Sequence, residues 1–260
     1  MLKKFLSIIG AYKIYEKWLW HQVKNGEKIE HIAIILDGNR RWATEKDLHP
    51  WLGHEAGAEK VEQLLDWCQK LDVKSITLYA FSTENFRRPK NEVEEIMRIA
   101  EEEFRKILVD ERIHKNKVRV KVIGRVKLLP ENLQQLIAEV EKATQNYDGR
   151  YLNIAFAYGG RAEIVDAARK IAKKVKNGEI KPEDVDEQLF EQFLYTSHMP
   201  KQDPDLIIRT SGEERLSGFL LWQSAYSEFC FLDVYWPDFR LIDLLRAVRI
   251  FQKRKRRFGT

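Results

Sequence analysis

The feature that most constrains the fold of this chain is a regular alternation of strand-like and helix-like segments. Short apolar runs typical of strands fall at residues 32–36, 75–81, 118–123, 151–157, 205–209 and 229–234. Helical patterns lie between and after them, at 55–71, 91–113, 130–146, 160–177, 183–195 and 239–255. Alternation of this kind predicts βαβ units with right-handed connections. We therefore expect an α/β fold built on a mainly parallel sheet.

The chain is expected to form a single domain with an N-terminal extension. Its 260 residues suffice for one sizeable core, and no repeat or low-complexity linker interrupts the alternation. The main domain is predicted over residues 29–260, and residues 1–28 form a separate amphipathic segment.

Wound as a helix, this N-terminal segment separates apolar from basic side chains. Its apolar side carries Phe5, Ile8, Ile9, Tyr12, Tyr15, Leu19 and Val23, and its basic side carries Lys3, Lys13, Lys17 and Lys24. A helix of this kind could lie on an anionic membrane surface as a peripheral contact. It could equally pack over the domain or against a partner subunit.

Charge and motif content narrow the classes of partner. The formal net charge of +5 is modest, and much of it comes from the basic run at residues 253–257. No nucleic-acid-binding signature is visible, so no nucleic acid is expected. Neither a zinc motif nor an apolar run long enough to cross a bilayer is present, and two cysteines lie in apolar patterns. A cytoplasmic protein is expected.

The first strand-like run ends in a group of residues suited to a phosphate ester. Asp37 offers hard oxygen ligands for Mg²⁺, Gly38 allows close backbone approach, and Arg40 and Arg41 match phosphate oxygens. The carboxyl end of a central parallel strand is where an open α/β sheet binds its ligand. Taken alone, the same stretch also fits a core strand followed by a solvated turn.

Two further strand ends repeat this chemistry. The second strand runs into Ser82, Thr83, Asn85 and Arg88, and the fifth ends in Arg209, followed by Arg215 and Ser217. Three arginine-bearing ends at one edge of a sheet, with apolar residues between them, favour a site for diphosphates joined to hydrocarbon. Neither a P-loop nor a dinucleotide fingerprint is present. Glu228 lies in an apolar context and needs a partner or a metal.

These residues resemble the cis-prenyltransferase family, the undecaprenyl and dehydrodolichyl diphosphate synthases, over residues 30–259. The motifs that carry the resemblance are His31-Ile-Ala-Ile-Ile-Leu-Asp-Gly-Asn-Arg-Arg-Trp42, Gly53-His-Glu-Ala-Gly57, Thr77-Leu-Tyr-Ala-Phe-Ser-Thr-Glu-Asn85, Ala157-Tyr-Gly-Gly-Arg161, Asp205-Leu-Ile-Ile-Arg-Thr-Ser-Gly-Glu213 and Trp236-Pro-Asp-Phe239. Arg257-Phe-Gly259 looks like the family's terminal Arg-x-Gly, which would reach across a dimer.

The resemblance implies a six-stranded sheet, a homodimer and a Mg²⁺-dependent enzyme that adds isopentenyl diphosphate repeatedly to an allylic diphosphate with cis geometry. The product would be a long polyprenyl diphosphate such as tritrans,polycis-undecaprenyl diphosphate, the precursor of a glycosyl carrier lipid. Asp37 and Asn85 would be catalytic, and Asp37 and Glu228 would bind the metal. The implied substrate-binding residues are Gly38, Asn39, Arg40, Arg41, Trp42, His54, Ser82, Thr83, Glu84, Phe86, Arg88, Arg209, Arg215 and Ser217.

Three departures from the bacterial pattern bear on the primer. Arg40 replaces a glycine, Pro50 replaces an arginine that binds the allylic diphosphate, and Phe86 replaces a tryptophan. The Arg40-Arg41 pair resembles archaeal and eukaryotic members, so geranylgeranyl diphosphate is expected rather than farnesyl diphosphate. Arg40 is a candidate to compensate for Pro50.

Two other functions stay open from the sequence. A phosphotransferase of the haloacid-dehalogenase type also places Asp after an apolar strand, although it expects a second Asp where Asn39 stands. The other alternative is a non-catalytic accessory subunit of a prenyltransferase.

Overall fold

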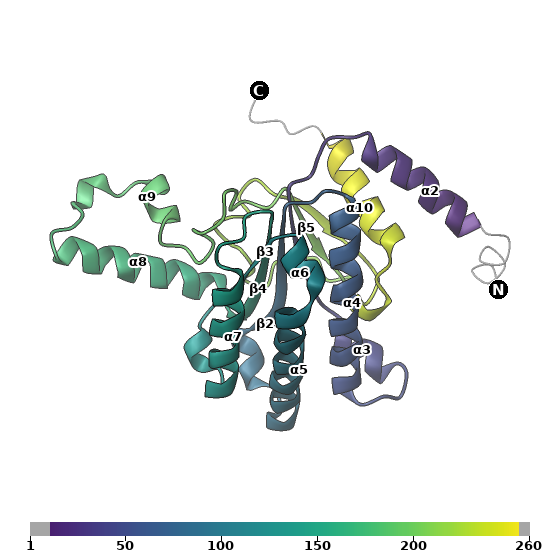
Figure 1. Cartoon of the computed structure of the whole chain (residues 1–260), viewed down its shortest axis with the longest axis horizontal. Helices are drawn as coiled ribbons and strands as arrows, with labels where there is room; N and C mark the ends of the chain where they lie inside the picture. The colour runs from purple at the N-terminus through teal and green to yellow at the C-terminus, as the bar shows by residue number, and fades with distance from the viewer. Residues whose placement is uncertain (1–10, 255–260) are drawn as a thin grey trace.

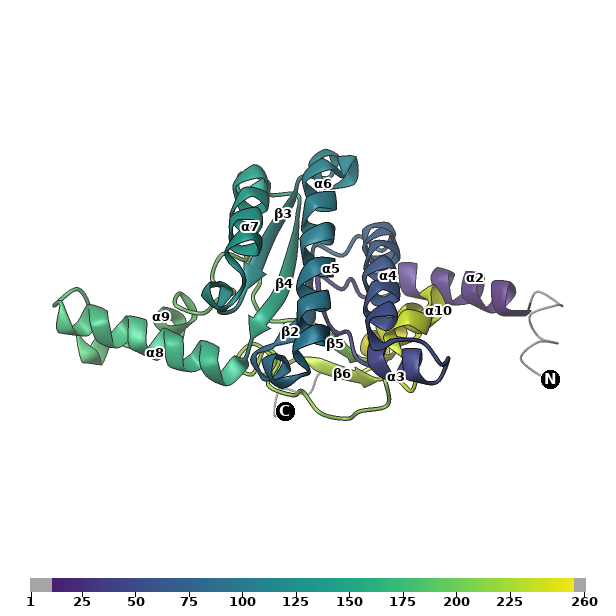
Figure 2. The same ribbon diagram turned by 90° about the horizontal axis from the view of Figure 1, so that it is seen from below.

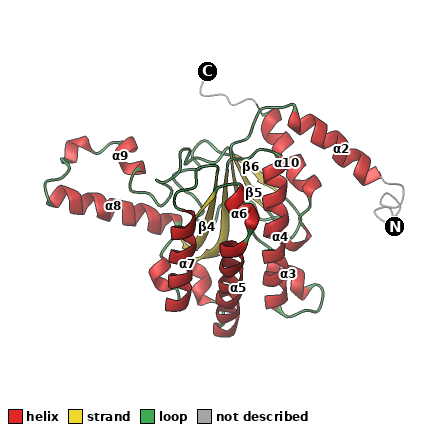
Figure 3. Cartoon of the chain, viewed as in Figure 1, coloured by secondary structure: helices red, strands yellow, loops and turns green. Residues whose placement is uncertain are grey.

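Six parallel strands form the centre of the computed structural model, which describes residues 11–254 (Figures 1 and 3). The strands are β1 (His31–Ile35), β2 (Ser75–Ser82), β3 (Val118–Ile123), β4 (Arg150–Tyr158), β5 (Leu206–Arg209) and β6 (Glu228–Phe231). They lie in the order β3-β4-β2-β1-β5-β6, and each neighbouring pair is parallel. The expected sheet is confirmed, and it contains no antiparallel pair within the described part of the chain.

The helices are arranged unevenly around the sheet. They are α2 (Ala11–Lys24), α3 (Asn39–Thr44), α4 (Pro50–Lys70), α5 (Lys90–Val109), α6 (Glu111–Lys115), α7 (Glu131–Thr144), α8 (Gly160–Lys176), α9 (Glu187–Glu191) and α10 (Leu241–Lys253), with short 3₁₀ turns η1 (Thr83–Arg87), η2 (Val126–Leu128), η3 (Pro182–Asp184) and η4 (Trp236–Asp238). Figure 2 shows α4, α5 and α7 standing over one face, while α8 extends away from the body with α9 beside it.

Side chains on the two faces of the sheet belong to two separate apolar cores. In β1, Ile32 and Ile34 belong to the large core shared with α4, α5, α7 and α10, whereas Ala33 and Ile35 belong to a smaller core on the opposite face. This alternation follows from the two-residue period of a strand. Because β1 is buried on both faces, its carboxyl end is held rigidly at the centre of the molecule.

The order of the strands reverses at β1. The chain passes from β1 to β2 on one side, and it later places β5 on the other side of β1. Such a switch point opens a crevice at the carboxyl ends of the strands. Asp37 follows β1 and Arg209 ends β5, so both residues lie at this crevice.

Several helix boundaries differ from the sequence-based expectation. The helix expected at 55–71 begins at Pro50, which is tolerated in a first turn because that position needs no backbone donor. The helix expected at 91–113 is broken at Asp110, whose carboxylate caps α6 by accepting a hydrogen bond from the Arg112 amide at 2.8 Å. Within 183–195, the α-helix covers only Glu187–Glu191.

Two glycines of α4 bring it close to the short helix α3. A β-carbon on Gly53 would lie 2.1 Å from the Asn39 carbonyl oxygen, and one on Gly57 would lie 2.7 Å from the Asn39 Oδ1 atom. A side chain at Gly53 would push the helices apart, because it would meet backbone, whereas one at Gly57 would displace the Asn39 side chain. The glycines therefore fix α3, and with it Arg40 and Arg41, against α4.

The described part of the N-terminal helix packs on the domain. In α2, Leu19 and Val23 are buried, and Arg246 and Arg249 of α10 stack on Tyr15 and Trp18. Packing over the domain is therefore observed for residues 12–23, and Phe5, Ile8, Ile9 and Lys3 lie outside the described residues. Between residues 11 and 254, the longest apolar helices fall short of what a bilayer crossing requires.

A buried histidine predicts a pH-dependent stability. His31 is fully buried, and its Nε2 atom lies 2.8 Å from the Thr77 hydroxyl. Burial lowers the pKa of His31 from 6.5 to about 4, with the Asp205 carboxylate opposing that effect. Between these two pH values the unfolded state binds more protons than the folded state, so the free energy of unfolding should fall as pH drops from 6.5 to 4. This single group contributes roughly 3 kcal/mol to that loss.

Denaturant unfolding at several pH values measures this effect. His31→Gln should show a shallower loss of stability between pH 6.5 and 4 than the unsubstituted protein. His21→Gln, at an exposed position, serves as the matched control and should leave the loss unchanged. An unaltered pH profile in His31→Gln would contradict the assignment.

Candidate active site

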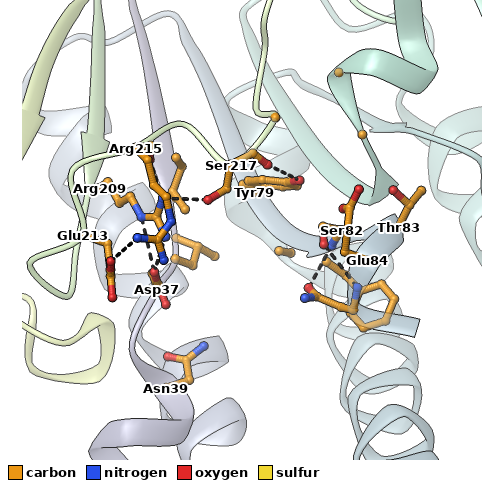
Figure 4. Close-up of a pocket in the computed structure, with 18 of the residues that line it drawn as sticks. Asp37, Asn39, Tyr79, Ser82, Thr83, Glu84, Arg209, Glu213, Arg215 and Ser217 are labelled. Atoms are coloured by element: carbon orange, nitrogen blue, oxygen red, sulfur yellow. Dashed lines mark hydrogen bonds and ion pairs between the residues drawn. The ribbon is translucent and has the colours of Figure 1, made fainter. Parts of the chain in front are cut away.

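The three arginine-bearing strand ends meet around one large pocket, as expected from the sequence. The pocket has a volume of about 950 Å³ (Figure 4). Of the predicted site residues, its lining includes Asp37, Gly38, Asn39, Arg40, Arg41, His54, Ser82, Thr83, Glu84, Asn85, Arg88, Arg209, Arg215 and Ser217. With Arg161, six arginines face three carboxylates in this lining. The pocket is thus suited to an anionic ligand.

Asp37 and Arg209 form the central ion pair of the pocket. The Nη2 atom of Arg209 lies 2.7 Å from Oδ2 of Asp37, and Nη2 of Arg41 lies 3.5 Å from Oδ1. Burial alone would raise the pKa of Asp37, but hydrogen bonds from Arg209 and Ser211 and the nearby charges outweigh it and hold that pKa below its usual value. Asp37 is therefore a carboxylate at neutral pH.

Gly38 turns the chain from β1 into α3. Its φ of +102° is a left-handed conformation that favours glycine, and a β-carbon would lie 2.6 Å from the Tyr235 ring. The turn brings the start of α3 to the pocket, so the helix presents Arg40 and Arg41 beside Asp37.

Arg209 also organises the loop that follows β5. Its Nη1 atom donates to the Arg215 carbonyl oxygen and, at 2.8 Å, to the Ser217 hydroxyl. Figure 4 shows Arg209, Arg215 and Ser217 on one side of the pocket, near Asp37. Arg215 itself pairs with Glu213 and is more than half exposed. Arg209 is therefore the buried anchor of this loop, and Arg215 is its accessible cation.

On the other side of the pocket, Ser82 and Asn85 hold each other in place. The Oδ1 atom of Asn85 accepts from the Ser82 amide at 2.9 Å, and the Ser82 hydroxyl accepts from the Asn85 amide at 3.3 Å. These bonds cap η1, on which Thr83 and Glu84 also lie. Since its carbonyl oxygen binds the backbone, Asn85 can offer its amide NH₂ group to a ligand.

Two arginines and a histidine of the pocket converge on Glu92 of α5. Its carboxylate lies 3.2 Å from Arg88 Nη1, 3.4 Å from His54 Nε2 and 3.6 Å from Arg40 Nη1. The Glu92 side chain is only 6% exposed and is surrounded by these three side chains. Burial and the Arg88 charge lower the pKa of His54 despite this carboxylate, so the imidazole is neutral near pH 7.

An apolar cavity of about 170 Å³ continues from the polar pocket. The two share Leu36, Asn39, His54 and Ala80 in their linings. Beyond that junction the cavity runs between α4, α5 and the sheet, lined by side chains such as Val61, Leu78, Ile96, Phe104 and Phe156. An anionic pocket and a hydrocarbon cavity are thus joined end to end.

Two predicted aromatic site residues lie outside the polar pocket. Trp42 is absent from the linings of both cavities and stacks under Lys46, whose Nζ atom is 3.8 Å from the ring centroid. Phe86 packs edge-on against Phe81 on the core side of η1. Neither side chain borders the polar pocket in this structure, because each is used in local packing.

Glu228 is not brought near Asp37 within one chain. It begins β6 opposite Leu206, at the amino end of the sheet, while Asp37 follows the carboxyl end of β1. Its carboxylate pairs with Arg254 at 2.6 Å. Within one chain these two carboxylates therefore do not meet, and the metal role of Glu228 stays a prediction. The register of β5 and β6 separates the two carboxylates.

The Asp37 carboxylate could bind Mg²⁺ in the way that is common in phosphate-binding sites. Such sites supply one or two carboxylates and leave the other positions to substrate oxygens and water. Among residues 11–254 no cluster of three or more metal-ligating side chains occurs. Asp37 is the residue that would hold the ion.

Sequence reasoning missed two side chains that shape the pocket. Glu213 bridges Arg41 at 3.3 Å and Arg215, although its place in the strand-end motif was visible. Tyr79 stacks on Phe219, and its hydroxyl lies 3.4 Å from the Ser217 carbonyl oxygen. The available signal for Tyr79 was its position in β2, close to the end of the strand that carries the predicted site residues.

The fold and the site define an α/β protein with an arginine-lined anion pocket that opens into a hydrocarbon cavity. Comparison with known proteins agrees. The Prenyltransf family model, for undecaprenyl diphosphate synthases, matches residues 35–259. A tritrans,polycis-undecaprenyl-diphosphate synthase (geranylgeranyl-diphosphate specific) from Methanopyrus kandleri is 54% identical over 254 residues, 98% of this chain and 93% of that protein. The protein of the same name from Methanocaldococcus jannaschii is 54% identical over 256 residues, 98% of this chain and 91% of its own.

Solved structures of similar proteins support the same family. The lavandulyl diphosphate synthase of Lavandula x intermedia, in complex with dimethylallyl diphosphate, has a TM-score of 0.86 and 40% identity and covers 90% of this chain and 99% of its own. A probable undecaprenyl diphosphate synthase from Campylobacter jejuni has a TM-score of 0.72 and 31% identity, with coverages of 90% and 100%. The chain belongs to the undecaprenyl diphosphate synthase family of prenyltransferases. The resemblance seen in the motifs is confirmed.

Proposed function

We propose that this protein is a cis-prenyltransferase that adds isopentenyl diphosphate repeatedly to an allylic diphosphate. The observation that carries the proposal is the junction of an arginine-lined pocket, centred on Asp37 and Arg209, with an apolar cavity between α4 and α5. A substrate with an anionic head and a growing hydrocarbon tail matches both halves of this site.

The pocket offers separate places for two diphosphates. Arg40, Arg41 and His54 lie where α3 and α4 meet the apolar cavity, and they would bind the diphosphate of the allylic substrate. Arg209, Arg215 and Ser217 lie on the loop after β5 and would bind isopentenyl diphosphate. This arrangement holds the two reacting carbons close together and supplies the proximity term of catalysis.

The residues of the pocket fit each stage of the condensation. Breaking the allylic carbon–oxygen bond leaves negative charge on the departing diphosphate, which the arginines stabilise. The double bond of isopentenyl diphosphate attacks the allylic carbon, and a proton then leaves the new chain. Mg²⁺ held by Asp37 would add further charge neutralisation at the diphosphate. Covering the cavity with apolar side chains keeps water from the cationic carbon.

Asn85 provides a test of the proton's path. An amide is a poor base at neutral pH, so Asn85 is proposed to donate its NH₂ group to a diphosphate oxygen that accepts the proton. Asn85→Asp keeps the acceptor for the Ser82 amide but places a negative charge at the diphosphate. We expect kcat to fall by about 10²-fold, measured by steady-state kinetics. Full activity in Asn85→Asp would remove the requirement for the amide.

The proposed primer is geranylgeranyl diphosphate, and the proposed product is tritrans,polycis-undecaprenyl diphosphate, a glycosyl carrier lipid precursor. The relatives from Methanopyrus kandleri and Methanocaldococcus jannaschii, whose names specify this primer and this product, support both assignments. The position of Arg40 supports the choice of primer, because its side chain lines the pocket and is 57% exposed. Pro50, in contrast, is the first residue of α4. Arg40 is proposed to supply the cation that Pro50 lacks.

We further propose a cytoplasmic homodimer with peripheral membrane contact. The arm of α8 and the edge near β6 expose Val165, Tyr226 and Phe231, which would suit a partner subunit.

The described part of α2 would suit an anionic membrane surface, because Ile14 is 70% exposed beside Lys13 and Lys17. The Arg257-Phe-Gly259 end, proposed to reach across the dimer, and most of the basic run at 253–257 lie outside the described residues.

Incubation with Mg²⁺, labelled isopentenyl diphosphate and one of several primers tests the proposal. Chain extension should be most efficient with geranylgeranyl diphosphate and less so with farnesyl diphosphate, and a chelator should abolish it. No extension by the purified protein with any primer would overturn the proposal and favour an accessory subunit. Hydrolysis of a simple phosphate ester with a phosphorylated Asp37 would instead favour the phosphotransferase alternative.

A further inference from the structure

One arginine of the polar pocket has no protein partner in the part of the chain that the structure describes. Of the six arginines that border the pocket, five make ion pairs with Asp37, Glu92 or Glu213. The sixth is Arg161 in the first turn of α8, which makes no ion pair or hydrogen bond with any described side chain. Arg161 is exposed and lines the pocket, so its guanidinium is free to bind an anionic ligand.

The backbone at the start of α8 places this arginine between two walls of the pocket. The Gly160 amide donates to the Gly218 carbonyl oxygen, on the loop after β5, at 2.8 Å. A β-carbon on Gly159 would lie 2.8 Å from the Thr83 hydroxyl oxygen of η1. Only the first turn of α8 borders the pocket, and the rest of the helix extends away from the body (Figure 2). Arg161 therefore lies where the loop after β5 and the turn η1 come together.

This position is separate from the hydrocarbon end of the pocket. The polar pocket and the apolar cavity share residues of β1, β2, α3 and α4, whereas none of residues 159–162 borders the apolar cavity. The allylic substrate would lead its hydrocarbon into that cavity, so its diphosphate would lie at the α3 and α4 side. The diphosphate close to Arg161 would be that of isopentenyl diphosphate, beside Ser217.

The charges on the loop after β5 leave room for another cation. Arg209 pairs with Asp37 at 2.7 Å, and Arg215 pairs with Glu213. These two ion pairs are formally neutral, whereas a diphosphate ester carries several negative charges at neutral pH. Arg161 would supply a positive charge that no carboxylate of the described chain already neutralises.

We propose that Arg161 binds the diphosphate of isopentenyl diphosphate and raises the affinity of the protein for this substrate. The inference rests on the proposed condensation activity. Arg161 contacts the diphosphate from α8, while Arg209, Arg215 and Ser217 contact it from the loop after β5. Because Arg161 has no partner within the described fold, its removal affects the complex with substrate and not the substrate-free protein.

Three substitutions test this role. Arg161→Gln removes the positive charge, and Arg161→Lys keeps a positive charge without the planar fork of donors. Arg169→Gln is the matched control, because Arg169 lies on the same helix, is 73% exposed and is outside the lining of the pocket. Steady-state kinetics give kcat and the two KM values when isopentenyl diphosphate and geranylgeranyl diphosphate are varied in turn. Denaturant unfolding without substrate measures the stability of each variant.

Arg161→Gln should raise the KM for isopentenyl diphosphate by about 10- to 100-fold, because a hydrogen bond between charged groups is lost. Arg161→Lys should recover part of this loss. The KM for geranylgeranyl diphosphate, kcat at saturating substrates and the free energy of unfolding should match those of the unsubstituted protein. Arg169→Gln should change none of these quantities.

An unchanged KM for isopentenyl diphosphate in Arg161→Gln would overturn the proposal, as would an increase confined to the KM for geranylgeranyl diphosphate. A loss of stability in substrate-free Arg161→Gln would also overturn it, because the arginine would then have a partner within the fold. In each of these cases the unsubstituted protein would still extend chains. No chain extension by the unsubstituted protein would refute the condensation activity, and this inference with it.

Discussion

Asp37→Asn is expected to lower kcat by on the order of 10³-fold. The substitution keeps the shape of the side chain but removes the charge that would hold Mg²⁺ against the diphosphate. Arg209 would still anchor the loop after β5 through the Arg215 carbonyl oxygen and the Ser217 hydroxyl. Initial rates of extension at saturating primer and Mg²⁺ measure the effect.

Asp233→Asn is the control for this prediction. Asp233 is an exposed carboxylate on the loop after β6, outside the lining of the pocket, and its loss should leave kcat unchanged. The pKa of Asp37, held below its usual value, also implies that activity near pH 6–8 does not report its protonation. Asp37→Asn with kcat within about tenfold of the original would contradict a direct role at the diphosphate.

Arg209→Gln is expected to have the second large effect, on both binding and folding. The Arg209 side chain is 5% exposed and contacts Asp37, the Arg215 carbonyl and Ser217. Losing charge-assisted hydrogen bonds to isopentenyl diphosphate should raise its KM by about 10²-fold. Asp37 would also lose its buried partner, which should cost about 3 kcal/mol of unfolding free energy. Steady-state kinetics and denaturant unfolding measure the two effects.

Arg215→Gln separates binding from folding in the same loop. Its side chain is 63% exposed and pairs with Glu213, so its loss should raise the KM for isopentenyl diphosphate with little effect on stability. If Arg209→Gln bound isopentenyl diphosphate normally, the loop after β5 would not be its binding site. A stable Arg209→Gln protein would show that the Asp37 pair does not contribute to folding.

The fold was predictable because strand and helix patterns in this chain are strong. Both faces of β1 are buried, so its continuous apolar run reads as a strand without ambiguity. The break at Asp110 was not predictable, because the apolar spacing of α5 continues into α6. Only the Asp110 carboxylate, which caps the start of α6 by accepting from the Arg112 amide, marks the break. The early start of α4 did have a local signal at Pro50, because proline is favoured at the first position of a helix.

Site residues at the ends of strands were predictable from the sequence. Site residues whose interaction partners are distant in the sequence were not. Parallel strands bring their carboxyl ends to one edge, so Asp37, Asn85 and Arg209 met as expected. Glu92 and Glu213 escaped notice because their partners come from other elements. The placement of Glu228 depends on the β5–β6 register, which its apolar surroundings do not reveal.

The most direct test of the central claim is a crystal structure with Mg²⁺ and an unreactive geranylgeranyl thiolodiphosphate. The diphosphate should lie among Asp37, Arg40, Arg41 and His54, and the hydrocarbon should run between α4 and α5 toward α6. A diphosphate bound away from Asp37, or a hydrocarbon tail that leaves the cavity between α4 and α5 empty, would contradict the account.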